Sequence, residues 1–165
     1  MAEKTLDDLF FDTLKDIYFA EKQILKALPK MARAAQSEEG KQAFLKHKEQ
    51  TEGQIERLQQ VFELIGKPAR GKTCEAIQGI IAEAEEIMDE FKGSPALDAG
   101  LISSAQAVEH YEIARYGTLK SWAGQLGLED AVALLDATLQ EEKETDELLT
   151  QLGEASANPK GKKAA

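Results

Sequence analysis

Apolar residues recur at intervals of three and four along four long segments of this chain. That spacing places them on one side of an α-helix, so each segment is predicted to be a helix with one buried face. The predicted helices cover residues 6–35, 38–65, 97–125 and 129–152. No stretch alternates apolar and polar residues for long enough to be a strand, so the pattern predicts an all-α protein.

The lengths of the connections favour one arrangement of these helices. A short turn near Ser37 joins the first two segments and another at Gly127 joins the last two, so each pair should form an antiparallel hairpin. The link between the two pairs is long, and residues 74–91 within it have the spacing of a further, shorter helix. We therefore expect a ferritin-like four-helix bundle with a long crossover that carries an extra short helix.

Composition and charge limit what such a domain can do. Residues 1–152 are expected to form the folded domain, and 153–165 a disordered basic tail. The formal net charge of −10 repels phosphate groups, so nucleic-acid binding is not expected. Apolar runs are too short to span a bilayer, and residues 1–8 lack the pattern of a secretory signal. A cytoplasmic protein without membrane contact is therefore expected.

Acidic residues interrupt the predicted apolar faces, where charged side chains are normally rare. They are Glu21 on the first helix, Glu49 and Glu52 on the second, Glu109 and Glu112 on the third, and Glu142 and Asp146 on the fourth. One acid on each helix lies about 15 residues from a hairpin turn, namely Glu21, Glu52, Glu112 and Glu142. Equal distances from a turn mean equal heights in antiparallel helices, so the four helices are predicted to bring carboxylates to one level.

Buried carboxylates at one level repel one another unless a cation lies between them. Two Fe or Mn ions would meet that need, because carboxylates chelate and bridge such metals in four-helix bundles. In this interpretation Glu52 and Glu142 bridge the ions, and the other five acids are terminal or supporting ligands. The alternative is a set of structural ion pairs formed with Lys48, Arg115 and Lys120.

Other chemically active residues fit a metal site less well. His47 lies more than a helical turn from Glu52, which favours a core or rim histidine over a ligand. His110 is rotated by about 100° from the preceding inward acid and is expected at the surface. Tyr116 follows Glu112 by one helical turn, so it should pack in the core and could donate a hydrogen bond to that carboxylate.

Four stretches of the chain carry a family resemblance: YFAEKQ at 18–23, EQTEGQIERL at 49–58, VEHYEIARYG at 108–117 and LQEEKETD at 139–146. They resemble the YciE/YciF family of bacterial ferritin-like proteins, also called the DUF892 group. The resemblance implies a homodimer, an association with stress responses and a carboxylate-rich metal site on the seven acids named above. Some members resemble the di-iron plan more closely, with His where this chain has Glu52. The all-oxygen set of this chain therefore favours harder ions such as Mn or Mg over a tightly held pair of Fe ions.

The sequence leaves more than one function open. A di-metal carboxylate protein would oxidise Fe(II) or reduce peroxide at the bundle core. A non-enzymatic stress or scaffold dimer would keep the same acids as protonated or ion-paired groups. A monooxygenase that acts on an organic substrate would also need a pocket beside the metals.

Overall fold

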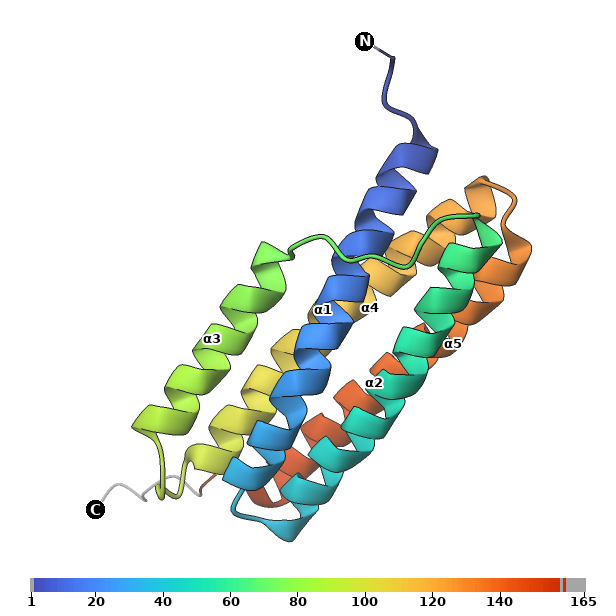
Figure 1. Ribbon diagram of the computed structural model, residues 1–165. Coiled ribbons are helices and arrows are strands. Elements are labelled where there is room, and N and C mark those ends of the chain that lie inside the picture. The colour runs from blue at the N-terminus through green and yellow to red at the C-terminus, as the bar shows by residue number, and fades with distance from the viewer. Residues whose placement is uncertain (1, 158, 160–165) are drawn as a thin grey trace.

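The computed structural model describes residues 2–157 and residue 159. Its main body consists of four long helices: α1 (Leu6–Ala34), α2 (Glu38–Leu64), α4 (Leu97–Gln125) and α5 (Glu129–Leu152) (Figure 1). α1 packs against α2 and α4 against α5, and contacts of α2 with α5 and of α1 with α4 close the bundle. The predicted all-α, ferritin-like four-helix bundle is confirmed.

The crossover between α2 and α4 carries the expected short helix, α3 (Glu75–Glu90). The chain leaves α2 and passes over α1, and α3 then lies on the outside of the bundle against α1 and α4 (Figure 1). A Cβ atom at Gly100 of α4 would lie only 2.6 Å from Cγ2 of Ile87. The glycine therefore permits the close approach of α3 to α4.

Capping residues determine where the first two helices begin. The Thr5 side chain accepts a hydrogen bond from the backbone N–H of Asp8, whose carboxylate accepts one from the Thr5 N–H, so α1 begins with a capping box. Ser37 caps α2. The carboxylate of Asp98 accepts hydrogen bonds of 2.8 Å from the backbone N–H groups of both Gln36 and Ser37. These bonds tie the α1–α2 turn to the start of α4.

The core lies along the axis that the four long helices share. Large side chains with almost no exposed surface fill it, among them Phe10, Leu14, Ile17, Phe44, Phe62, Leu101, Leu119 and Leu135. Each helix turns a polar face outward, and within the described residues no helix combines the length and apolar character that a bilayer crossing requires.

The end of α5 differs from the sequence-based expectation. Residues 153–165 were expected to be disordered, but Gly153–Ala157 form a π-helical turn that contacts α4 and α5. Gly153 has ordinary right-handed helical angles, so it does not end the helix, and Ala157 is buried. Most of the remaining predicted tail, residues 158 and 160–165, lies outside the described part of the chain.

Candidate metal centre

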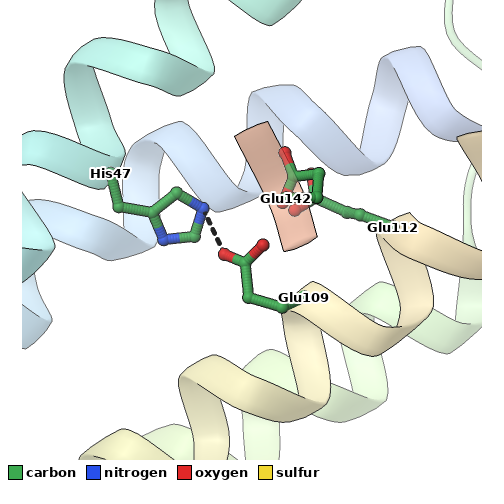
Figure 2. Close-up of side chains that lie close together, drawn as sticks. All are labelled: His47, Glu109, Glu112 and Glu142. Carbon is green, nitrogen blue, oxygen red and sulfur yellow. Dashed lines mark ion pairs between the residues drawn. The ribbon is translucent and has the colours of Figure 1, made fainter. Parts of the chain in front are cut away.

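Four buried side chains from three helices meet in the middle of the bundle (Figure 2). They are His47 of α2, Glu109 and Glu112 of α4, and Glu142 of α5, and each offers one ligand atom within 4.8 Å of the others. Ligands on opposite sides of one ion lie about 4 to 4.5 Å apart, given metal–ligand bonds of about 2.0–2.2 Å. A small inward adjustment would therefore let this cluster hold a metal ion.

Glu21 of α1 adds a fifth buried group beside these four. It is fully buried, and one of its carboxylate oxygens accepts a 2.7 Å hydrogen bond from the hydroxyl of Tyr116. Burial raises the pKa of Glu21 to about 7, and the negative charge of Glu142 adds to this effect. The partner of Tyr116 is thus Glu21 rather than Glu112, the carboxylate expected from the helical spacing. All four long helices contribute a ligand-type side chain.

The carboxylates lack the partners that buried ionised groups require. Both side-chain oxygens of Glu109, Glu112 and Glu142 lack a hydrogen-bond donor, and so does Oε2 of Glu21. In the metal-free protein these oxygens can hydrogen-bond only to one another, when one carboxyl group of a pair is protonated. Without a nearby positive charge, such groups take up protons rather than remain ionised.

Of the cations named in the alternative interpretation, Lys48 forms the expected ion pair with one of the predicted acids, Glu52, at the surface. Lys120 contacts Asp136, which is not one of those acids. Arg115 donates a hydrogen bond to the hydroxyl of Tyr111. Within the described residues, therefore, the three expected cations do not neutralise the buried acids.

Burial and mutual repulsion shift the acid–base equilibria of the cluster. Burial raises the pKa of Glu109 to about 8. It also raises the pKa of Glu112 and of Glu142 well above the usual value, and neighbouring carboxylates raise both further. A bound cation would oppose these shifts, because it stabilises the ionised carboxylates.

His47 has the properties of a neutral ligand. Its Nε2 lies 2.7 Å from Oε1 of Glu109, the contact that the dashed line marks in Figure 2. The contact does not have hydrogen-bond geometry, since neither atom has a hydrogen-bond partner. Burial lowers the pKa of His47, which keeps the imidazole neutral with a lone pair available to a metal.

Comparison with known proteins shows which family has this helical arrangement. A family model described as "Domain of unknown function (DUF892)" matches residues 5–161. The chain belongs to the DUF892 family. Protein YciF of Escherichia coli (strain K12) is 46% identical over 166 residues, which cover 100% of both chains. The resemblance to the YciE/YciF group is therefore confirmed.

Solved structures of relatives have the same fold as this DUF892 chain. The crystal structure of the E. coli stress protein YciF matches with a TM-score of 0.90 at 47% identity, over 96% of this chain and 100% of that one. YcfI from Rhodopseudomonas palustris matches with a TM-score of 0.87 at 48% identity, over 89% and 94% of the two chains.

Two of the acids predicted for the site point away from it in this DUF892 chain. Glu49 and Glu52 are exposed, and Glu52 lies 3.0 Å from the ammonium group of Lys48 at the surface. Their predicted inward orientation is wrong because the apolar face of α2 was aligned on Leu45, whose side chain is 42% exposed. Glu52 follows Leu45 by seven residues and therefore shares its outward direction.

His47 replaces these two acids as the contribution of α2. It lies three residues after Phe44 and four before Thr51, and both of these residues are buried. That spacing was visible in the sequence, and a helical face aligned on Phe44 would have identified His47 as inward-facing.

Asp146 lies one helical turn beyond Glu142, next to the cluster but outside it. Its side chain is 21% exposed and one oxygen lies 3.1 Å from Nε2 of His110, which is at the surface as predicted. Its negative charge helps to raise the pKa of Glu109, after the effects of burial and of Glu21. Asp146 therefore influences the site electrostatically.

Proposed function

We propose that this protein binds Fe or Mn ions in its bundle core and uses them to react with peroxide, with Fe(II) as the electron donor. The main support is the convergence of buried, unpartnered groups from all four long helices. Such an interior is unfavourable without a cation and well suited to one. Because E. coli YciF is named as a stress protein, we extend the proposal to a stress-related role.

The donor set fits such ions. One imidazole and several carboxylates suit Fe and Mn, and four-helix di-metal sites use the same donors, usually with a second histidine. His47 and Glu109 would hold one ion and Glu21 and Glu112 a second. Glu142 lies in the same cluster of ligand atoms as His47, Glu109 and Glu112 and would complete the set.

The residues of the chain would prepare the site for the ions. When bound, the ions would supply redox chemistry, with Fe(II) as the electron donor to peroxide. Tyr116 orients Glu21 through its hydrogen bond, and burial of the cluster keeps bulk water away. The raised pKa values of the glutamates mean that metal binding displaces protons, so the affinity for metal should rise with pH.

A second function has support from a relative. The name given to YcfI from R. palustris suggests a structural role, which corresponds to a non-enzymatic stress or scaffold dimer. In that case the glutamates would stay protonated and the protein would need no metal. The family resemblance also supports a homodimer, which we include in the proposal together with the cytoplasmic location expected from the sequence.

Metal analysis separates the two functions. Protein purified without chelator and then incubated with Fe(II) or Mn(II) under nitrogen should retain about two ions per chain after desalting. Glu142→Gln should lose most of this metal, whereas Glu86→Gln, the same change at an exposed position of α3, should not. If the unmodified protein retains no more metal than Glu142→Gln, the metal-dependent function is wrong.

A further inference from the structure

A groove with a volume of about 320 Å³ lies between α2 and α5, next to the metal centre. Its lining includes Phe44, His47 and Gln50 from α2, and Thr145, Leu148 and Leu149 from α5. We call it the α2–α5 groove. Its volume is at the lower end of the range for small-molecule pockets, which is about 300–1,000 Å³.

His47 belongs both to this groove and to the metal centre. Its side chain is almost fully buried, yet it forms part of the groove lining, and neither ring nitrogen has a hydrogen-bond partner. A buried polar group without a partner indicates that something else satisfies it. The histidine therefore links the groove directly to the site where metal would sit.

A hydrogen-bonding pair lies close to His47 in the groove. The hydroxyl of Thr145 donates a 3.1 Å hydrogen bond to Oε1 of Gln50 and so connects α5 to α2. Gln50 follows His47 by three residues, which places both side chains on the same side of α2. Because the amide oxygen of Gln50 is the acceptor in this bond, its NH₂ group remains available to donate to a bound molecule.

The remaining lining combines one exposed apolar side chain with polar and charged ones. Leu148 is 40% exposed although it is a large apolar side chain, and it lies beside Phe44 and Leu149 in the groove lining. The charged residues of the lining have both signs, since Lys46 lies in it together with Glu144 and Glu147. Leu148 therefore offers the apolar contact for a bound molecule, and the polar side chains around it offer hydrogen-bonding groups.

We propose that the α2–α5 groove binds a small, uncharged organic hydroperoxide, with its apolar body against Leu148 and its peroxide end toward His47. The class of molecule rests on the proposed function, in which peroxide is the oxidant. In the overall reaction, ROOH, two Fe(II) and two protons give ROH, water and two Fe(III); the O–O bond breaks as each Fe(II) gives up one electron. The alcohol product retains the same apolar body and a hydroxyl group, so it binds the same groove.

The binding step can be tested without metal or turnover. The alcohol 2-phenyl-2-propanol, a redox-inert analogue of cumene hydroperoxide, is titrated into the metal-free full chain and followed by ¹H–¹⁵N NMR. We expect saturable shifts at the backbone amides of the α2 and α5 residues that line the groove. Shifts that do not saturate at millimolar alcohol, or that spread evenly over the bundle, would overturn the proposal.

Two groove variants and one control variant locate the binding. Ala43 lines the groove, so Ala43→Phe should fill it and abolish saturable binding, whereas Ala82→Phe at an exposed position of α3 should leave binding unchanged. Leu148→Ala removes exposed apolar surface at little risk to folding and should weaken binding by about tenfold. Equal binding by all three folded variants would contradict the assigned site.

Metal binding by the same variants separates this inference from the proposed function. Ala43→Phe changes no proposed ligand, so its metal content should equal that of the unmodified protein. Metal retention without alcohol binding would overturn the hydroperoxide site and leave the metal-dependent function intact. A third outcome would also overturn the proposal: the unmodified protein binds no alcohol, and Ala43→Phe takes up Mn(II) more slowly. That result would identify the groove as a route for ions.

Discussion

Two pairs of glutamates have the same spacing but opposite surroundings. Glu109 and Glu112 on α4 are fully buried and lack a hydrogen-bond donor, whereas Glu49 and Glu52 on α2 face solvent. The difference lies in the apolar residues around each pair. It shows that the spacing of two acids on a helix does not define a site until the orientation of the helix is known.

The largest contrast between the pairs should be in metal affinity. The double change of Glu109 and Glu112 to Gln removes two proposed ligands, whereas the same change at Glu49 and Glu52 removes none. The α4 variant should lose affinity for Mn(II) by about 100-fold or more, since residues that only orient ligands already contribute about 10- to 100-fold. Competition with a metal-sensitive dye measures this, and equal affinities for the two variants would contradict the site.

The second contrast is in how the stability of the metal-free protein depends on pH. A carboxyl group whose folded-state pKa is raised favours folding most below its unfolded pKa of about 4.5, and this contribution is lost as pH rises through the folded value. With Glu21 at about 7 and Glu109 at about 8, the free energy of unfolding should fall between pH 5 and 8. The fall should be on the order of a few kcal/mol in total.

Urea denaturation at several pH values, with chelator present, measures this effect. The α4 double variant should show a much flatter profile, because amides do not titrate, and the α2 double variant should keep the original slope. A profile that is unchanged in the α4 variant would mean that other groups cause the pH dependence.

A smaller effect is expected for Tyr116→Phe, which removes the hydrogen bond to Glu21 but keeps the aromatic ring. The metal-free protein should lose about 1 kcal/mol of unfolding free energy. Metal affinity should fall by about tenfold, the lower end of the range for residues that orient ligands, since Glu21 itself remains. Thermal denaturation with and without Mn(II) measures both quantities. A loss of metal affinity as large as that of the α4 double variant would show that Tyr116 does more than orient Glu21.

The smallest effect concerns the surface pair on α2. Lys48→Ala breaks the contact with Glu52, but both side chains are largely exposed, so the free energy of unfolding should change by less than about 0.5 kcal/mol. Metal affinity should not change. A clear loss of metal in this variant would restore a role for Glu52 at the site.

Most of the fold could be predicted because local signals determine it. The turn at Ser37, the turn at Gly127 and the apolar periodicity placed the helix ends within about one residue of those observed. The helical turn that follows Gly153 was not predicted, because glycine commonly ends a helix. Here Gly153 has backbone angles that any residue could adopt, so the helical structure continues.

The candidate site was harder to predict because it depends on helix rotation. On α1, α4 and α5 the acids lie among clearly inward apolar residues, and Glu21, Glu109, Glu112 and Glu142 are indeed brought together. On α2, Phe44 and Leu45 are adjacent and both apolar, yet they point about 100° apart. Packing against the neighbouring helices turns Phe44 inward. The local sequence alone does not show which of these two residues faces the core.

The carboxylate of Asp98 opposes sliding of α4 along the bundle, because such a movement would break two hydrogen bonds. It is anchored to the backbone of the α1–α2 turn by both of its oxygens, far from His47. A slip of α4 by one helical turn, about 5.4 Å, would preserve much of the apolar contact but carry both of its buried glutamates out of reach of the imidazole. The spacing of the would-be ligands is thus set at the end of the molecule, by a residue that touches none of them.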